Sequence, residues 1–489
     1  MPTENILLTM ADLRNQRNLH LLRRATFGPS EKDYLSLHKR TTKEWTKQLL
    51  EESSDIPEAL DVVPAPLKAI LERTEQQGRS ALTEEEKRMI REQLREGLKS
   101  LNLTWLKEMT QSKQQLREKM AFFWHGHFAC RNNNVVYQQQ LLQIIRTHAL
   151  GNFGTLLKEV SKSAAMINFL NNNQNRKDHP NENFAREVME LFTMGRGYYT
   201  ETDIKEAARA FTGWNNQMNG DFIFRKFQHD YGNKSILGDT GNFDGDDVLN
   251  ILLKKKETSV FICRKLYRFL VSDEVNEQNV MWMADRFFKS HYDIASLLKD
   301  IFSSDWFYEP ANQGAKIKSP IELIVGIQRE LPLEWKKPEG QLLMQRLLGQ
   351  MLFYPPNVAG WPGGKNWIDS SSLMLRLRIP QLIFGLQELY MNPKADDDQM
   401  MGMMERSKNA MGRLGGQLLH ADIHWDERMK RMAEVPREKL AETLCAQLLY
   451  SSTPIDTSIV ARYADASSRE AFIKTLTIQL MSSPEYQLC

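Results

Sequence analysis

The chain has 489 residues, of which 41% are hydrophobic, and this is enough to bury a substantial core in two or three lobes. Lysine and arginine together number 64 against 62 aspartates and glutamates, which leaves a formal net charge of +2. This balance argues against a general nucleic-acid-binding surface, because such surfaces usually carry a marked basic excess, and we expect no nucleic-acid partner; a local basic groove stays open.

The cysteine pattern and the hydropathy narrow the class of protein further. The four cysteines are scattered and form no CxxC pair, so the sequence offers neither a zinc ribbon nor a thioredoxin-like motif. No apolar run approaches the roughly 20 residues that cross a bilayer, so no membrane span is predicted. The first residues lack the basic start, apolar stretch and cleavage site of a leader. We therefore expect a cytoplasmic protein; a trimmed leader, or export together with a partner, stays open.

The first part of the chain has the pattern of short helices followed by a projecting hairpin. Residues 27–30 form a break, and Ser30 is expected to cap the helix that follows. Thr83 and Glu86 have the spacing of a capping box and predict a long helix that runs to about Ser100. Its charges alternate in sign, which is typical of a solvent-exposed helix. We expect a charged helical hairpin, the arm, at about 65–115.

Two histidines close a strongly apolar stretch after the arm. On a continuous helix His125 and His127 would point about 200° apart, so they can share a metal only if the helix ends there, which the glycine between them permits. In extended backbone the same spacing suits a metal site. The alternatives are a divalent metal ion held by this pair and buried, hydrogen-bonded imidazoles. Arg117 and Arg146 are nearby candidates for substrate binding.

The stretch 181–214 contains two short helical patterns joined by a Gly/Tyr turn. Glu187 and Glu190 lie three residues apart on the first pattern, and Glu206 and Arg209 lie three apart on the second. Because a tight turn can bring two helices together, these four side chains form a candidate catalytic cluster. The alternative is that they are solvated and pair along their own helices, an arrangement that contributes only about 0.2–0.5 kcal/mol per pair.

The segment 354–367 cannot form regular structure, because three prolines and three glycines interrupt it. It carries Asn357, Trp361 and Trp367, which are candidates for substrate binding. Aromatic faces bury area at a low entropy cost and could form a platform for a flat or sugar-like ligand. The alternative is an ordered loop that pins two helices.

Three parts are expected along the chain. Residues 1–391 form the main helical domain with its arm, 392–435 form a flexible, methionine-rich linker or insertion, and 436–489 form a C-terminal helical cap. Alternating β-branched runs are scarce. The predicted fold class is therefore all-α, a large compact multi-helix domain, with a small β-hairpin near 221–237.

Several blocks recur in the order typical of one family. The clearest are NENFAREVMELFTMG and YTETDIKEAARAFTGW, and others along nearly the whole chain are HLLRRATFGPS, REKMAFFWHGHFA, GDTGNFDGDDVLNILL, KIKSPIELIVG and LGQMLFYPPNVAGWPGGKNWI. Together they resemble domain family 1800 (DUF1800), a large bacterial family of unknown function. The resemblance implies no settled activity. It implies a partner, because genes of this family often lie beside those of a second family, DUF1501, which resembles sulfatases and phosphatases.

Two hypotheses for function follow. The first is a hydrolase that acts on a glycan or related polar polymer, with the two histidines, the three glutamates and Arg209 gathered beneath the Trp361 loop. Either a divalent metal activates water or two carboxylates act as acid and base. The second is a non-catalytic partner or scaffold that works with a DUF1501 protein through the charged arm and the methionine-rich segment.

Overall fold

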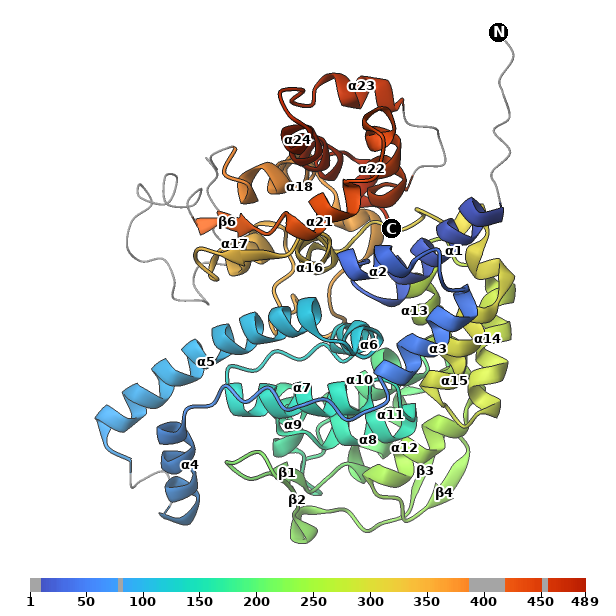
Figure 1. The fold of residues 1–489 in the computed structure, drawn as a ribbon. Helices are drawn as coiled ribbons and strands as arrows, with labels where there is room; N and C mark the ends of the chain where they lie inside the picture. The colour runs from blue at the N-terminus through green and yellow to red at the C-terminus, as the bar shows by residue number, and fades with distance from the viewer. Residues whose placement is uncertain (1–9, 78–81, 387–417, 451–455) are drawn as a thin grey trace.

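The chain folds into helices packed around two hydrophobic cores (Figure 1). The structure is a computed structural model that describes residues 10–77, 82–386, 418–450 and 456–489. Within these ranges it is 63% helical, with 22 helices and three small two-stranded sheets. The predicted all-α fold class is confirmed.

The elements follow one another with short connections. The first fifteen helices are α1 (Met10–Ala25), α2 (Glu31–Ser36), α3 (Thr42–Glu52), α4 (Ala65–Gln77), α5 (Glu84–Gln111), α6 (Gln115–His127), α7 (Val135–His148), α8 (Phe153–Lys162), α9 (Ala164–Phe169), α10 (Asn183–Glu187), α11 (Glu201–Ala210), α12 (Gly245–Lys254), α13 (Lys256–Leu270), α14 (Glu277–Lys289) and α15 (Ile294–Ser303). The remaining described helices are α16 (Pro320–Glu330), α17 (Gly340–Leu347), α18 (Ser370–Ile383), α21 (Asp426–Met432), α22 (Leu440–Leu448), α23 (Thr457–Arg462) and α24 (Arg469–Met481).

Helix α16 lies between the two cores and contributes to both. Every one of its eleven residues is buried. Ile321 and Val325 belong to the first core, which the helices from α1 to α15 surround, whereas Leu323 and Ile327 belong to the second. A helix that is apolar around most of its circumference is expected to be buried in this way. The polar side chains that α16 does carry are consequently placed in the interior.

The second core joins the middle of the chain to its C-terminal part. It contains side chains of α16, α17 and α18 together with those of α21, α22 and α24. Strand β5 (Leu333–Trp335) pairs antiparallel with β6 (Ala421–Ile423), so segments about ninety residues apart in sequence lie side by side. Part of the predicted linker, from 418 onward, therefore contributes β6 and α21 to this core. Residues 392–417 lie outside the described residues.

The arm is formed by α4 and α5 and extends from the body at the left of Figure 1. The expected capping box is present: Glu86 N donates to Thr83 Oγ1 at 3.2 Å, and Thr83 N donates to a Glu86 carboxylate oxygen at 2.9 Å. The helix runs to Gln111 and not to about Ser100 as predicted. It continues because the residues after Ser100 carry an apolar face, including Leu101, Trp105 and Leu106, that packs into the first core.

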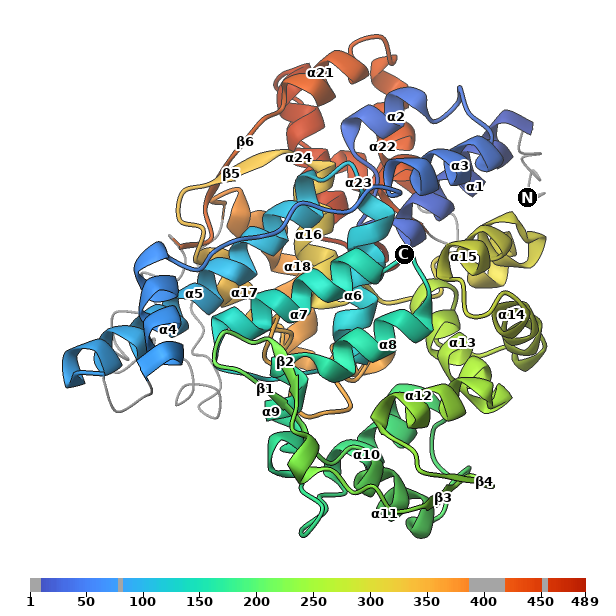
Figure 2. The ribbon, with the colours of Figure 1, turned by 90° about the horizontal axis from the view of Figure 1, so that it is seen from below.

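Two small hairpins overlap the range 221–237 where one was predicted. Strand β1 (Trp214–Asn216) pairs with β2 (Phe222–Phe224), and β3 (Lys234–Ile236) pairs with β4 (Asp239–Gly241). Both lie beside α9 to α12 at the lower edge of the molecule, as the view from below also shows (Figure 2). They position the loop that follows α11.

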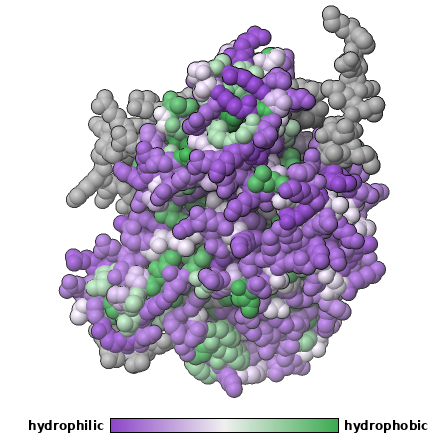
Figure 3. All heavy atoms as spheres, viewed as in Figure 1, coloured by the Kyte–Doolittle hydropathy of each residue, from purple (hydrophilic) through white to green (hydrophobic). Residues whose placement is uncertain are grey.

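The surface seen in Figure 3 is mostly hydrophilic, with small and separate apolar patches. Among the described residues, no helix combines the length and the apolar character that crossing a membrane would require.

Candidate functional site

Glu187 and Glu190 lie on one helix, but only Glu190 has partners. Helix α10 ends at Glu187 and continues as a π-helical segment, Val188–Thr193, where regular α-helix was expected. Glu190 accepts a hydrogen bond from the Tyr199 hydroxyl at 2.7 Å and forms an ion pair with Arg196. Glu187 makes no hydrogen bond or ion pair with any residue that the structure describes. The pair is thus asymmetric.

The asymmetry displaces the two pKa values in opposite directions. Burial, and then the neighbouring Glu190 carboxylate, raise the pKa of Glu187. Burial acts in the same sense on Glu190, but hydrogen bonds from Tyr199 and Arg196 outweigh it and lower the pKa of Glu190. At a pH between the two values, one carboxyl is protonated beside an ionised one, which is the arrangement that acid–base catalysis uses.

Glu206 and Arg209 belong to a different network. Arg209 donates to a Glu206 carboxylate oxygen at 2.8 Å and to Asp230 at 2.7 Å, while Ser235 N donates to Glu206 at 3.2 Å. These bonds fix α11 to the loop that leads into β3. Glu187 and Glu190 take no part in them. The four predicted catalytic residues therefore take part in two separate sets of contacts: Glu190 bonds to Tyr199 and Arg196, whereas Glu206 and Arg209 bond to each other and to the loop that leads into β3.

His125 and His127 do not converge either, because α6 continues through both. Phe353 N donates to His125 Nε2 at 3.3 Å, and the imidazole stacks on Trp361 with a ring-centre distance of 5.5 Å. Lys265 Nζ donates to His127 Nδ1 at 3.2 Å, so Nε2 carries the hydrogen and donates to Phe192 O at 3.2 Å. The geometry matches the predicted alternative of buried, hydrogen-bonded imidazoles.

Burial sets the protonation of both histidines. It lowers the pKa of His125 to about 3. It also lowers the pKa of His127 well below the usual value, and the Lys265 ammonium group adds to this effect. Both rings are therefore neutral at pH 7. Within the described ranges, no group of three or more His, Cys, Asp or Glu side chains is placed to hold a metal ion.

Arg117 and Arg146, predicted to bind substrate, are instead buried in the body with internal partners. Arg146 Nη2 donates to Glu118 at 2.7 Å, and Trp105 Nε1 donates to the same carboxylate at 2.9 Å. Arg117 donates to four main-chain carbonyls, including that of Ser53 at 2.6 Å. Their guanidinium groups join α6, α7 and the segment after α3.

The loop at 354–367 lies against α6. Trp361 stacks on His125, Trp367 is 8% exposed, and the Asn357 side chain accepts a hydrogen bond from Ala359 N at 2.9 Å. Gly360 has a φ of +86°, and a Cβ there would lie 2.6 Å from the carbonyl oxygen of Gly126. The stacking of Trp361 on α6 and the burial of Trp367 favour the alternative of an ordered loop packed on helices. Of the three candidates, Asn357 is the exposed one.

A large open groove that the sequence did not predict lies between the arm and the body. Its free volume is about 1620 Å³, and its walls come from α2, α3, the second half of α5, β5 and the start of α21. Hydroxyl and amide side chains are frequent along it: Ser30, Ser36, Gln48, Ser100, Thr104, Thr110, Gln111, Ser112, Gln115, Gln328 and Gln341. We call it the arm groove.

Charge in the arm groove is balanced. Six basic residues line it (Lys32, Arg40, Lys107, Lys113, Arg329 and Lys430), and so do six acidic residues (Glu31, Asp33, Glu52, Glu334, Asp426 and Glu427). The half-buried Trp335 lies among them, and its Nε1 donates to Gln328 Oε1 at 2.8 Å, which fixes the indole. Arg329 donates to Gly28 O and to Thr110 O and pairs with Asp33, so it holds the walls together.

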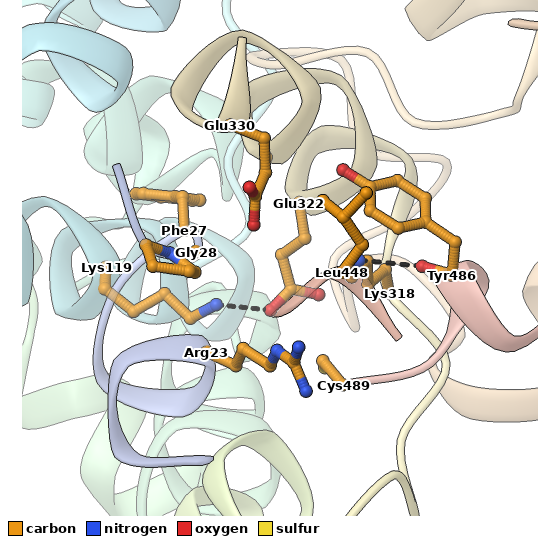
Figure 4. Close-up of a pocket in the computed structure, with 12 residues that line it drawn as sticks. Arg23, Phe27, Gly28, Lys119, Lys318, Glu322, Glu330, Leu448, Tyr486 and Cys489 are labelled. Atoms are coloured by element: carbon orange, nitrogen blue, oxygen red, sulfur yellow. Dashed lines mark hydrogen bonds and ion pairs between the residues drawn. The ribbon is translucent and has the colours of Figure 1, made fainter. Parts of the chain in front are cut away.

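A second, much smaller cavity lies beside α16, and we call it the basic pocket (Figure 4). Its free volume is about 20 Å³. Glu322, Gly326 and Glu330 line it from one face of α16, spaced four residues apart, and Lys119 Nζ pairs with Glu322 at 2.5 Å. The remaining lining residues are Arg23, Phe27, Gly28, Pro29, Lys318, Leu448, Tyr486 and Cys489.

Sequence reasoning missed both cavities for the same reason. Their walls come from segments hundreds of residues apart, and no short motif marks such a convergence. One local signal was present: Lys316 and Lys318 directly precede a capping box formed by Ser319 and Glu322, in a block that is otherwise apolar. Charged residues at the start of a fully buried helix indicate an internal ionic site.

Comparison with known proteins gives one match. A family model described as "Protein of unknown function (DUF1800)" matches residues 20–488, nearly the whole chain. No curated protein matches the chain, and no solved structure does.

Proposed function

Because the chain belongs to the DUF1800 family, whose description assigns no activity, we propose a function from its own geometry: binding of an extended, uncharged polar polymer of the glycan class in the arm groove. The observation that carries the proposal is the lining of that groove. It combines many hydroxyl and amide groups with equal numbers of acidic and basic side chains.

The balance of charge favours a neutral ligand. A polyanion would be attracted by a basic excess and a polycation by an acidic one, and the arm groove has neither. Hydroxyl and amide side chains donate and accept hydrogen bonds, so they match the hydroxyl groups of a sugar chain. The groove is also open to solvent, which suits a polymer that extends beyond the protein.

Trp335 supplies the apolar contact that such a ligand needs. Its indole is held by Gln328, which in turn donates to Gln341 Oε1 at 3.1 Å. An aromatic ring fixed in this way binds the apolar face of a sugar with little loss of side-chain entropy. Platforms were expected at Trp361 and Trp367; the proposal places the platform at Trp335.

Affinity electrophoresis tests the proposal with defined probes: dextran, a β-glucan and a galactomannan as neutral polymers, and alginate and chondroitin sulfate as charged ones. We expect a neutral polymer to retard the protein, and Trp335→Ala to weaken the retardation about tenfold. Trp282→Ala is the matched control, because Trp282 is also half-buried but lies on α14, outside the groove.

Two results would count against the proposal. Retardation by the charged polymers alone would contradict the argument from charge balance, and equal retardation of wild type and Trp335→Ala would place the ligand elsewhere. Absence of retardation together with stable binding of a DUF1501 protein would favour the scaffold hypothesis.

A second candidate function, hydrolysis of the bound polymer, is supported by the opposite pKa shifts of Glu187 and Glu190. Glu187 would act as the acid and Glu190 as the ionised partner. Neither residue lines the arm groove.

Release of reducing ends from any retained polymer should fall about 100-fold or more in Glu187→Gln and in Glu190→Gln. Glu201→Gln, which alters the neighbouring pair with Arg186, is the control. Full activity in both glutamate variants would exclude this site.

A further inference from the structure

Trp335, Gln328 and Gln341 all line the arm groove and are joined by hydrogen bonds that run in one direction. Trp335 Nε1 donates to Gln328 Oε1 at 2.8 Å, and Gln328 Nε2 donates to Gln341 Oε1 at 3.1 Å. An indole N–H can only donate, so it fixes which end of the Gln328 amide faces Trp335. Gln328 then presents its NH2 group to Gln341, which accepts with its oxygen. The orientation of both amides thus follows from the indole.

The far end of this series is a hydrogen-bond donor without an acceptor. The oxygen of Gln341 is taken by Gln328, and Gln341 Nε2 donates to no residue that the structure describes. Because Gln341 lines the arm groove, this NH2 group is available to a ligand there. An amide NH2 group donates and does not accept, so the ligand has to bring an acceptor to it.

Gln341 is fixed in place before any ligand binds. The residue is 7% exposed, and its backbone N donates to Pro338 O at 3.1 Å. Helix α17 begins at Gly340, where an added Cβ would collide with the carbonyl oxygen of Leu418. This close packing holds the start of α17 against the segment that leads into β6. A donor that is already fixed loses little conformational entropy when a ligand arrives.

The same end of the arm groove holds most of its apolar surface. Among the described residues that line the groove, five are apolar, and four of these lie within 332–338: Pro332, Leu333, Trp335 and Pro338. The serines and threonines of the lining lie elsewhere, on or beside α2 and α5. A ligand group bound beside Gln341 therefore needs an apolar part as well as an acceptor, whereas sugar hydroxyl groups find partners along the rest of the groove.

Glu334 adds an acceptor to this end of the arm groove. It lines the groove next to Trp335 in sequence, and its side chain makes no hydrogen bond or ion pair with any described residue. A carboxylate accepts hydrogen bonds, whereas the Gln341 NH2 group donates them. An amide substituent on a ligand matches both, because its carbonyl accepts and its N–H donates.

We propose that the arm groove selects sugars that carry an acetamido group, so that its ligands are polymers containing N-acetylhexosamines, and that Gln341 determines this specificity. The inference rests on the proposed function, since it names the sugar that the groove takes. The acetamido carbonyl accepts from Gln341 Nε2, its N–H donates to Glu334, and its methyl group lies on the apolar surface around Trp335. A hydroxyl group at the same position of the sugar has no methyl group and leaves that surface in contact with water.

Two pentasaccharides with the same β-1,4 linkage test the inference by isothermal titration calorimetry. Chitopentaose carries an acetamido group on each ring where cellopentaose carries a hydroxyl group. We expect wild type to bind chitopentaose at least about tenfold more tightly, because only the acetamido group makes the apolar contact together with both hydrogen bonds.

Gln341→Glu replaces the donor by an acceptor. The affinity for chitopentaose should then fall about tenfold, and the affinity for cellopentaose should change little, since a hydroxyl group can donate as well as accept. Gln111→Glu is the matched control: it introduces the same charge into the groove, but at the end of α5, and should keep the preference for chitopentaose.

Trp335→Phe tests the series of hydrogen bonds separately. It keeps an aromatic ring but removes the N–H that orients Gln328, so both amides can reverse. The preference for chitopentaose should fall in this variant too. Saturation-transfer NMR of wild type keeps the test decisive if Gln341→Glu does not fold, because the acetyl methyl protons of bound chitopentaose should then receive the strongest saturation.

Three results would count against the inference. Equal affinity of wild type for the two pentasaccharides would overturn it and leave glycan binding in the groove intact. A preference for chitopentaose that survives both Gln341→Glu and Trp335→Phe would overturn it as well, by placing the recognition of the acetamido group elsewhere. Binding of neither pentasaccharide, together with no retardation by any neutral polymer, would overturn the proposed function and this inference with it.

Discussion

At the scale of single residues, burial decides whether a charged side chain predicted to belong to the site is available to a ligand. Arg117 and Arg146 lie in apolar blocks, and this placement suggested a substrate site. The same placement buries them, so each finds internal partners: Arg146 the Glu118 carboxylate, and Arg117 a set of carbonyls. A charged residue inside an apolar pattern therefore indicates an internal network here as much as a binding site.

Breaking the Arg146 network should reduce stability. Arg146 is fully buried and Glu118 is 0% exposed, so Arg146→Met leaves an unpaired carboxylate in the interior. We expect a loss of about 3–5 kcal/mol in the free energy of unfolding, measured by denaturant titration. Replacing Glu118 by leucine as well should recover part of the loss. Unchanged stability in the single variant would show that the pair is not formed.

The opposite pKa shifts of Glu187 and Glu190 predict opposite effects of pH on stability. The folded protein binds the Glu187 proton more tightly than the unfolded chain does, so this contribution to stability is lost as pH rises through the folded pKa. Glu187→Gln stays neutral and should be more stable than wild type at pH 7. The difference should disappear on acidification to about pH 4 or below.

Glu190 should behave in the reverse sense. Its folded pKa is lowered, so its contribution is present at neutral pH and is lost as pH falls through that value. Glu190→Gln should be less stable than wild type at pH 7 and should match it in acid. Denaturant titrations of both variants over the same pH range check the two signs. The same sign for both would contradict the asymmetry of the pair.

At the scale of elements, the π-helical segment Val188–Thr193 shows how neighbouring helices alter a regular pattern. Met194 N reaches back five residues to Met189 O at 3.0 Å. The carbonyls of Leu191 and Phe192 are bound from outside the helix, by Lys265 Nζ at 3.2 Å and by His127 Nε2 at 3.2 Å. Side chains of α6 and α13 thus supply bonds that an α-helical turn would have made itself.

The contact of the 354–367 loop with α6 depends on one glycine. Gly360→Ala would place a methyl group 2.6 Å from Gly126 O at a φ of +86°, so we expect a loss of about 1–3 kcal/mol in the free energy of unfolding. Gly363→Ala in the same loop is the control, because its φ is −94° and no atom lies within 4 Å of the added carbon. Equal effects of the two substitutions would mean that the loop does not pack as described.

At the scale of the whole molecule, the second core is built from two parts of the chain that lie far apart in sequence. Helices α16 to α18 contribute side chains to it, and so do residues within 418–450 and 456–486. Arg428 Nε in α21 also pairs with the buried Glu31 in α2 at 2.5 Å, which joins the late segment to the first core. The C-terminal part is therefore integral to the packing around α16.

A chain ending at residue 391 should not fold normally. It would leave the buried apolar side chains of α16, such as Leu323 and Ile327, without their partners from α22 and α24. We expect binding of a hydrophobic dye and loss of the cooperative unfolding transition. Addition of a 392–489 fragment should restore the transition at least in part. A monomeric, cooperatively folded 1–391 fragment would show instead that the first core is sufficient.

Sequence alone determined what depends on neighbouring residues: the helical class, the helix cap at Ser30, the capping box at Thr83, the arm, and the family blocks. These are set by helical periodicity and by hydrogen bonds spanning three or four residues. Only the tertiary structure decided which charges meet, because the arm groove and the basic pocket join segments from α2 to α21 and from α1 to Cys489. Glu190 and Glu206, close in sequence, have separate partners, whereas Lys119 and Glu322, 203 residues apart, share one ion pair.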